Sequence, residues 1–492
     1  MRRAVLIICL FCCLTTACRK EHFQHVVVYF TADTNGFYSL RSEPGLGGKE
    51  AGGYGVLKNF LDTLQEPYLL FDGGNWFGAS AEGIITKGAF ITPFLKNIPY
   101  TAATVSAADF AYGWPSLRTT LREVDFPFVA SNLRLENKLP WPLHDYQIRT
   151  VGNIKIGIFG LVSLPAKDTR LQGITALDPV QIAQEMVSLF KEKKVDYIIL
   201  LSSLGTPQDN ELSDLSLAQE VDGIDLILSS NQSREQAETE EVNHTYIVYP
   251  GAGLDSLAKI TISFDKTKQV RYTDVEDIIL LKETYGEDEN LALTAEALRK
   301  KTETQMNKIL SFVPQMLVND PSKPSPLGTL LAQCLHAWAK LDGALLNGAA
   351  IRRPLLAGDL TENDLYKMYP YGDNITFLTM RGSALKQALQ SSLNADDNFP
   401  QLAGMSVYYR NMGIGKMITK IVLANGKEVK PQNTYRLAVT DHVLAGGFGH
   451  DDFINSLEFK NTFVEARQIM RQCFSKQKEI VAPKEVYFKE EK

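Results

Sequence analysis

The chain has 492 residues, of which 45% are hydrophobic and 22% charged, and its formal net charge is −6. Because a single hydrophobic core stops growing at about 250–300 residues, a chain of this length is expected to form at least two domains. The composition is that of a soluble globular protein, and the negative charge argues against nucleic acid as a partner.

The first 17 residues have the pattern of an export signal. Arg2 and Arg3 precede an apolar run over 4–14 that is too short to span a bilayer, and small residues lead to Cys18. The segment resembles a bacterial lipoprotein signal, which implies cleavage before Cys18 and a lipid on its thiol. Thr15 stands where such signals usually have leucine, so an ordinary secretory signal is the alternative. Either way we expect an exported protein, and the lipoprotein reading anchors it to a bacterial membrane on the periplasmic or surface side.

Residues 18–280 are predicted to form an α/β domain. Most of its apolar runs end in Asp, Ser, Gly or Asn, which is typical of folds that present functional loops at strand ends. The runs expected to be strands are 26–30, 68–71, 127–130, 154–162, 197–202 and 226–228. Residues 255–264 alternate apolar and polar, which predicts an antiparallel strand.

A linker is expected over 281–314. Within it, residues 288–311 hold apolar positions at helical spacing among many Lys, Glu, Gln and Thr, which predicts a long, mostly solvated helix. Four prolines between 314 and 326 mark a boundary. A second, smaller α/β domain is expected over 315–492, with a charged tail from 484 onward that frays.

Two cysteines, Cys334 and Cys473, lie outside the signal and anchor segment. A disulfide between them is possible in an exported protein, but their spacing does not require one. Cys334 lies in an apolar, helix-like run and also fits a small buried hydrophobic residue.

Five polar motifs lie at 31–36, 72–75, 106–113, 200–205 and 228–233, and all but the third follow or overlap the end of a predicted strand. In order and spacing these motifs resemble those of the bacterial 5′-nucleotidase and UDP-sugar hydrolase family. The resemblance covers nearly the whole chain after the signal. It implies a four-layer metallophosphatase-like sandwich over 18–280, a linker helix, and a smaller α/β nucleotide-binding domain.

In active members of that family the five loops bind two divalent metal ions. The resemblance implies that here most ligands are replaced and that the remaining positions are vestigial: Asp33, Asn35, Asn75, Asp109, Ser203, Asn231 and Ser233. The metal-binding asparagine and the catalytic histidine correspond to Ala107 and Ala108. Between 25 and 265 the only histidines are 25, 144 and 244, whereas a site for two transition metals generally draws several imidazoles.

We therefore expect the two-metal site to be lost, and with it the metal-bound hydroxide that would act as nucleophile. No cofactor is predicted. The remaining oxygen-bearing side chains leave two interpretations open. They can hold magnesium or calcium, which accept carboxylate and amide oxygens, or they are turn residues that satisfy the loop backbone.

The C-terminal domain keeps more of the family pattern. Residues 347–352 resemble its Asn-x-Gly-Gly-Ile-Arg motif, which implies that Asn347 hydrogen-bonds a nucleotide and Arg352 pairs with its anionic end. Phe399 and His450 take the positions of two base-stacking aromatics, and such stacking contributes about 1–3 kcal/mol per base. The alternatives are a core aromatic at Phe399 and a structural turn at Asn347 and Arg352.

The leading hypothesis is a catalytically inactive lipoprotein that binds a nucleotide or nucleoside through its C-terminal domain. Its other expected partner is the membrane, through Cys18; no oligomeric state is predicted. The alternatives are residual nucleotide hydrolysis with an altered metal site, and an adhesin or scaffold that uses neither site.

Overall fold

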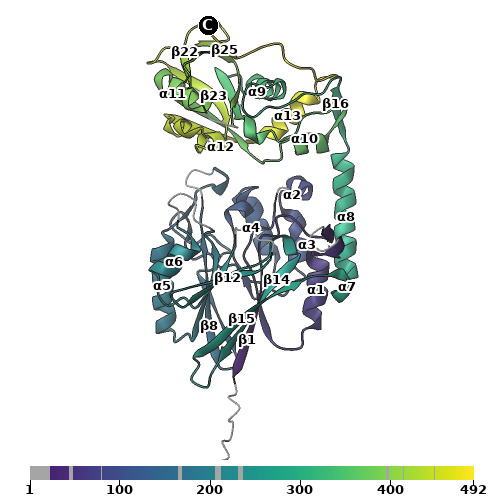
Figure 1. Cartoon of the computed structure of the whole chain (residues 1–492), viewed down its shortest axis with the longest axis vertical. Coiled ribbons are helices and arrows are strands. Elements are labelled where there is room, and N and C mark those ends of the chain that lie inside the picture. Colours follow the sequence, from purple (N-terminus) through teal and green to yellow (C-terminus); the bar gives the residue numbers. More distant parts are fainter. Residues whose placement is uncertain are drawn as a thin grey trace, which may run out of the picture.

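The computed structural model describes residues 23–43, 48–78, 80–164, 169–205, 212–230, 236–394, 398–413, 415–447 and 449–491. The predicted signal, Cys18, Asn231 and Ser233 lie outside these ranges. Two α/β domains are joined by a long helix that runs along one edge of the molecule (Figure 1). No helix in the described ranges is long and apolar enough to cross a membrane.

The N-terminal domain contains two large sheets that face each other. The first has the order β15(Val270–Ile279), β14(Ser256–Phe264), β1(Gln24–Thr31), β4(Tyr68–Asp72), β5(Ala102–Ala103). The second has the order β12(Glu238–Val242), β13(Thr245–Tyr249), β11(Leu226–Ser229), β10(Tyr197–Ser203), β8(Ile154–Val162), β7(Tyr146–Val151). β14 is antiparallel to β1, as the alternation of 255–264 predicts.

Alternate residues of the central strands explain the layering. In β10, Ile199 and Leu201 are buried in the core between the two sheets, whereas Ile198 and Leu200 pack outward against helices. The helices on that outer face are α5(Pro179–Glu192) and α6(Asp214–Glu220).

An aromatic-rich cluster covers the outer face of the first sheet. The helices on that side are α1(Gly53–Thr63), α2(Ala81–Thr86), α3(Thr92–Leu95) and α4(Trp114–Glu123). The domain is therefore the expected four-layer sandwich. The run at 127–130 forms isolated bridges at Phe128 and Val129 rather than a strand.

The linker helix is α8(Glu289–Met306), which follows the short α7(Lys282–Tyr285). Asp288 caps its N-terminus by accepting from the Leu291 backbone N–H, and few of its side chains are buried, as expected. The helix ends before the predicted 311, because residues Ile309–Val313 form β16 and pair with β18(Gly358–Thr361). The sheet structure of the second domain thus begins at residue 309 rather than 315.

The C-terminal domain is built on a sheet with helices on both faces. Its order is β20(Pro400–Ala403), β17(Gly343–Asn347), β23(Thr434–Thr440), β19(Asn374–Arg381), β24(Glu458–Glu465). One face packs against α9(Pro326–Ala339), α10(Glu362–Met368) and α13(Ala466–Phe474). The other packs against α11(Gly382–Leu393), α12(Asp441–Leu444) and a small sheet of β21(Met405–Asn411), β22(Lys416–Leu423) and β25(Phe488–Glu490).

The C-terminal tail corrects one prediction. β25 pairs in parallel with β21, with Phe488 opposite Val407, and Phe488 is buried. The expectation that the tail frays throughout 484–492 is therefore wrong for residues 488–490. Cross-strand hydrogen bonds and the burial of one aromatic ring hold this segment to the domain.

A disulfide joins Cys334 of α9 to Cys473 of α13. The sequence left this pairing open, and Cys334 is both buried and disulfide-bonded. The bond ties together two helices that pack side by side on the same face of the C-terminal sheet.

Candidate functional site

The polar motifs of the N-terminal domain meet at the carboxyl ends of its parallel strands. Thr31 of β1 lies opposite Asp72 of β4, and Ser202 of β10 lies opposite Ser229 of β11. The two sheets are joined there by Ser230, whose Oγ donates to the Gly73 carbonyl oxygen at 2.8 Å. Motifs far apart in the sequence therefore share one edge of the sandwich.

Asn75 lies at the centre of this strand-end cluster. Its Nδ2 donates to Asp33 Oδ1 at 2.9 Å and to Asn35 Oδ1 at 3.0 Å. Asn35 Nδ2 in turn donates to the Asp33 backbone carbonyl at 2.8 Å. All three residues have left-handed backbones with φ between 51° and 65°, which Asn and Asp adopt more readily than other side chains. Three predicted metal-ligand positions are thus bonded to one another through amide hydrogens.

Two buried carboxyl groups, those of Asp72 and Asp109, accept hydrogen bonds from residues of these loops. Asp72 accepts from Thr31 Oγ1, the Gly74 N–H and Trp76 Nε1 at 2.6–2.7 Å. Burial raises the pKa of Asp72 to about 7, and these donors act in the opposite direction.

Asp109 accepts from three backbone N–H groups, those of Asn75, Trp76 and Ser106, each at 2.8 Å. Burial raises the pKa of Asp109 to about 6, against the effect of those donors. Both of its oxygens are committed to the backbone, so Asp109 holds the shape of the loop rather than facing an ion.

The remaining predicted positions supply little chemistry. Ala107 and Ala108 lie in a short helical turn, Ala107–Phe110, where Ala108 is exposed. Ser203 ends β10, and its buried Oγ has no hydrogen-bond partner among the described residues.

Asp214 is a buried acid that belongs to none of the five motifs and was not predicted as a site residue. It accepts from the hydroxyls of Ser202 and Ser229 at the ends of two adjacent strands, and burial raises its pKa to about 6. The available signal was an acidic residue directly after Ser213, the N-cap of a helix.

The donors present do not fit a pair of transition-metal ions. No group of three or more His, Cys, Asp or Glu in the described ranges has the arrangement of a metal site. His25 lies at the start of β1 and bonds Ser263, and His244 lies in the turn between β12 and β13. His144 pairs through its backbone with Phe128. Imidazole, the ligand that such ions favour, is therefore absent from the described part of the cluster.

In the C-terminal domain, Asn347 and Arg352 flank the turn after β17. Asn347 is 4% exposed, and its Oδ1 has no hydrogen-bond partner among the described residues. Arg352 is exposed and borders a hollow of about 390 Å³ together with Asn319, Pro321 and Arg353. An open acceptor and an exposed guanidinium thus lie a few residues apart.

Phe399 and His450, the expected stacking pair, are both in the interior. Phe399 is 1% exposed, and its ring packs edge-on against Phe488 with centroids 4.8 Å apart. His450 is fully buried, its Nδ1 lies 2.7 Å from Ser392 Oγ, and burial lowers its pKa to about 4. Neither ring is open to a base in this conformation, so the stacking role stays a prediction that requires movement.

Comparison with known proteins finds similarity to 5′-nucleotidases and related phosphoesterases. Residues 300–454 match the model of the 5′-nucleotidase C-terminal domain. The chain is 26% identical over 413 residues to the trifunctional nucleotide phosphoesterase protein YfkN of Bacillus subtilis, covering 75% of this chain and 28% of that protein. It is 23% identical over 439 residues to bovine 5′-nucleotidase, covering 78% and 75% of the two chains. The chain spans about a third of YfkN and of a second Bacillus subtilis relative, endonuclease YhcR.

Two solved structures share the fold over almost the whole chain. The 5′-nucleotidase precursor from Thermus thermophilus superposes with a TM-score of 0.65 at 19% identity, covering 95% of this chain and 99% of that one. A Staphylococcus aureus protein assigned as a 5′-nucleotidase, crystallised with α-ketoglutarate, gives 0.74 at 18% identity, covering 95% and 100%. They confirm the predicted two-domain α/β architecture.

Proposed function

The chain belongs to the 5′-nucleotidase family, with its C-terminal domain and a metallophosphatase-like N-terminal region, and from this premise we propose that it binds a nucleotide or nucleoside without hydrolysing it. In this proposal the C-terminal domain holds the ligand. The N-terminal domain keeps the scaffold of a two-metal enzyme but not its chemistry.

The observation that carries the proposal is the Asn75 amide. Its Nδ2 points at the oxygens of Asp33 and Asn35, the direction from which those oxygens would bind a cation. A neutral N–H donor satisfies these oxygens without a metal, and it supplies none of the positive charge that generates hydroxide at neutral pH. The acid that would protonate a leaving group is also missing, because Ala108 occupies the predicted position.

Binding is supported by two groups beside the turn after β17. The buried Asn347 Oδ1 has an unused acceptor, and such an atom favours a donor from a ligand or water. Arg352 is exposed at the edge of a hollow, and a guanidinium there suits phosphate or carboxylate oxygens.

Calorimetry with AMP, adenosine and UDP-glucose tests the proposal. We expect at least one of them to bind, and Arg352→Ala to weaken the two phosphate-bearing ligands more than adenosine. Arg410→Ala, an exposed arginine of β21, serves as the matched control and should change nothing. If none of the three ligands binds the wild-type protein, the proposal fails.

A second candidate is residual hydrolysis with magnesium or calcium, and one geometric fact favours testing it. If the Asn75 side-chain amide turned over, its Oδ1 would join the oxygens of Asp33 and Asn35 around one point. Three such oxygens suit a hard cation. Release of a chromogenic phenol from a phosphate ester in magnesium would support this candidate, provided that Asp33→Ala abolishes it. Equal rates in wild type and variant would reject it.

We also propose that the protein is exported and anchored to a membrane through a lipid on Cys18. The support is the pattern of the first 18 residues, together with the disulfide Cys334–Cys473, since such bonds persist mainly in oxidising compartments. Metabolic labelling with a radioactive fatty acid tests it. Label should appear in the wild type and disappear in Cys18→Ser; label retained in the variant would reject the assignment.

A further inference from the structure

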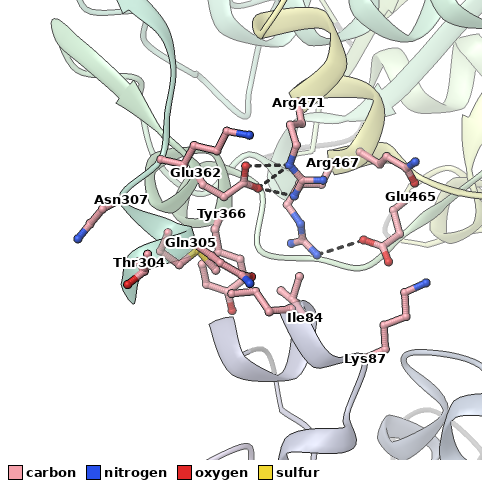
Figure 2. A pocket seen from close by; sticks show the side chains of 14 residues that line it. Ile84, Lys87, Thr304, Gln305, Asn307, Glu362, Tyr366, Glu465, Arg467 and Arg471 are labelled. Atoms are coloured by element: carbon pink, nitrogen blue, oxygen red, sulfur yellow. Dashed lines mark hydrogen bonds and ion pairs between the residues drawn. The ribbon is translucent and has the colours of Figure 1, made fainter. Parts of the chain in front are cut away.

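A cavity of about 750 Å³ lies at the joint between the two domains, and its lining shares no residue with either site described so far. Its walls come from three parts of the chain. Residues of α2 and the turn after it line one side, the end of α8 another, and α10, β24 and α13 of the C-terminal domain the third (Figure 2). Small-molecule sites commonly occupy about 300–1,000 Å³ and often lie between domains.

Arg467 is the most informative residue in this cavity. It is 1% exposed, yet its Nε has no hydrogen-bond partner in the described structure. Its Nη1 donates to the Tyr369 carbonyl at 2.9 Å, and Nη2 lies 3.5 Å from Glu465 Oε2, at the edge of hydrogen-bonding distance. A buried guanidinium normally has its donors filled, so this one has capacity left for an acceptor.

A second unused polar atom lies beside it. The Tyr366 hydroxyl is buried without a partner among the described residues, and the Arg467 guanidinium carbon lies 5.4 Å from the Tyr366 ring centroid. The aromatic face thus supports the cation, while the hydroxyl and Nε remain available for a bound oxygen.

The charge around the cavity is positive. Four cations line it, Lys87, Lys308, Arg467 and Arg471, against two carboxylates, Glu362 and Glu465. Glu362 is engaged by Arg471, which donates to both of its oxygens from Nε at 2.7 and 2.8 Å. Lys87 and Lys308 form no ion pair with any described carboxylate. The two unpaired ammonium groups give the cavity a positive charge that favours an anion.

We propose that this cavity binds a small organic oxyanion, a phosphate or carboxylate group carried on a carbon skeleton. The unused donors of Arg467 and Tyr366, with the ammonium groups of Lys87 and Lys308, receive the anionic oxygens. The apolar side chains of Ile84, Ile85 and Met306 contact the rest of the ligand. Because Lys87 belongs to the N-terminal domain and Arg467 to the C-terminal domain, one bound ligand contacts both domains.

Calorimetry with AMP, citrate and inorganic phosphate tests this site. AMP or citrate should bind with a Kd below about 1 mM and more tightly than inorganic phosphate. Lys87→Gln combined with Lys308→Gln should weaken that binding about tenfold or more, and added salt should weaken it further. Lys301→Gln, an exposed lysine of α8 outside the cavity, is the matched control and should leave the Kd unchanged.

Tyr366→Phe keeps the ring and removes the hydroxyl, so it tests the buried donor without removing the packing. We expect it to weaken binding about threefold or more, with little change in melting temperature. The proposal is overturned if neither AMP nor citrate binds, or if binding survives both the lysine pair and Tyr366→Phe. Binding that is lost only in Arg352→Ala would also overturn it, because the ligand would then occupy the site proposed for nucleotide.

Discussion

At the scale of single residues, the strand-end cluster depends on which atom Asn75 turns toward Asp33. An aspartate at this position would place two carboxylates at a separation where one of them must be neutralised by a proton or a cation. The amide avoids that repulsion by donating hydrogen bonds, so the three loops close on themselves. Asparagine at position 75 therefore removes the need for a neutralising cation and joins the three loops by hydrogen bonds.

Asn75→Asp tests this account directly. Without divalent cations we expect the free energy of unfolding to fall by about 1–3 kcal/mol, because the new carboxylate faces Asp33 and the two amide bonds are lost. Millimolar Mn²⁺ should then raise the melting temperature of the variant but not of the wild type. Asn75→Ala, which loses the bonds without adding charge, should be destabilised and insensitive to Mn²⁺. An Asn75→Asp protein with no Mn²⁺ response would contradict the account.

His450 predicts a pH dependence in the other domain. Burial lowers its folded pKa to about 4, against an ordinary value of 6.5. Between those pH values the unfolded chain binds more protons, so this contribution to stability is complete above pH 6.5 and is lost as the pH falls toward 4. The loss is at most about 3 kcal/mol.

Urea unfolding of the wild type and His450→Gln at several pH values isolates this effect. The difference in unfolding free energy between the two proteins should shrink as the pH falls from 7 to 4.5. The comparison cancels the opposite contributions of Asp72, Asp109 and Asp214, whose raised pKa values reduce stability as the pH rises toward 6 or 7. A difference that stays constant with pH would show that His450 is not buried in its neutral form.

At the scale of elements, the disulfide between α9 and α13 closes a loop across a sequence separation of 139 residues. Cross-linking so long a loop restricts the unfolded chain, and removing it typically costs about 2–5 kcal/mol. We expect the double variant Cys334→Ser, Cys473→Ser to destabilise the C-terminal domain by this amount and to leave the N-terminal domain unchanged. Trp338 lies in the C-terminal domain and the other three tryptophans lie in the N-terminal domain. In proteins that also carry Trp338→Phe, tryptophan fluorescence therefore reports unfolding of the N-terminal domain alone. Equal destabilisation of both domains would contradict the prediction.

The elements that sequence could predict are those whose signal is local. The runs at 26–30 and 154–162 are apolar, bounded by polar residues and buried on both faces, so they are recognisable without knowledge of their partners. The pairing of β25 with β21 depends on residues far away in the chain, and the charged tail gave no local sign of it. The run at 127–130 has the composition of a strand, but the adjacent β5 is only two residues long and offers little to pair with.

The same distinction applies to the candidate sites. Motif resemblance predicted that Asp33, Asn35 and Asn75 would meet, because the order of strands in a fold fixes which loops are neighbours. It left open whether Phe399 is a core aromatic, and it gave no sign that His450 is buried, because Phe488 and Ser392, which contact these two rings, lie outside the motifs. The cavity at the domain joint left no sequence signal at all, since it forms only when α2, α8 and α13 come together.

At the scale of the whole molecule, the hydrophobic clusters divide at the linker. Leu291 and Ala295 of α8 belong to the core of the N-terminal domain, and no described apolar cluster extends across the joint. One close approach there is between backbones: a Cβ placed on Gly372 would lie 3.8 Å from the Ala111 carbonyl oxygen, in the segment that follows Ala107 and Ala108. The two domains are therefore expected to unfold separately, with α8 as part of the first.

Hydrogen exchange tests this division. When the disulfide is reduced, the C-terminal domain loses stability, and its amides should exchange faster at moderate urea concentrations. The amides of α8 should keep the protection of the N-terminal domain over its first three turns, because Leu291 and Ala295 remain buried against that core. Mass spectrometry of peptides from 289–300 and from β23 gives the two rates. If the amides of α8 instead exchanged together with those of β23, the helix would unfold with the C-terminal domain. The boundary between the two unfolding units would then lie before α8 rather than after it.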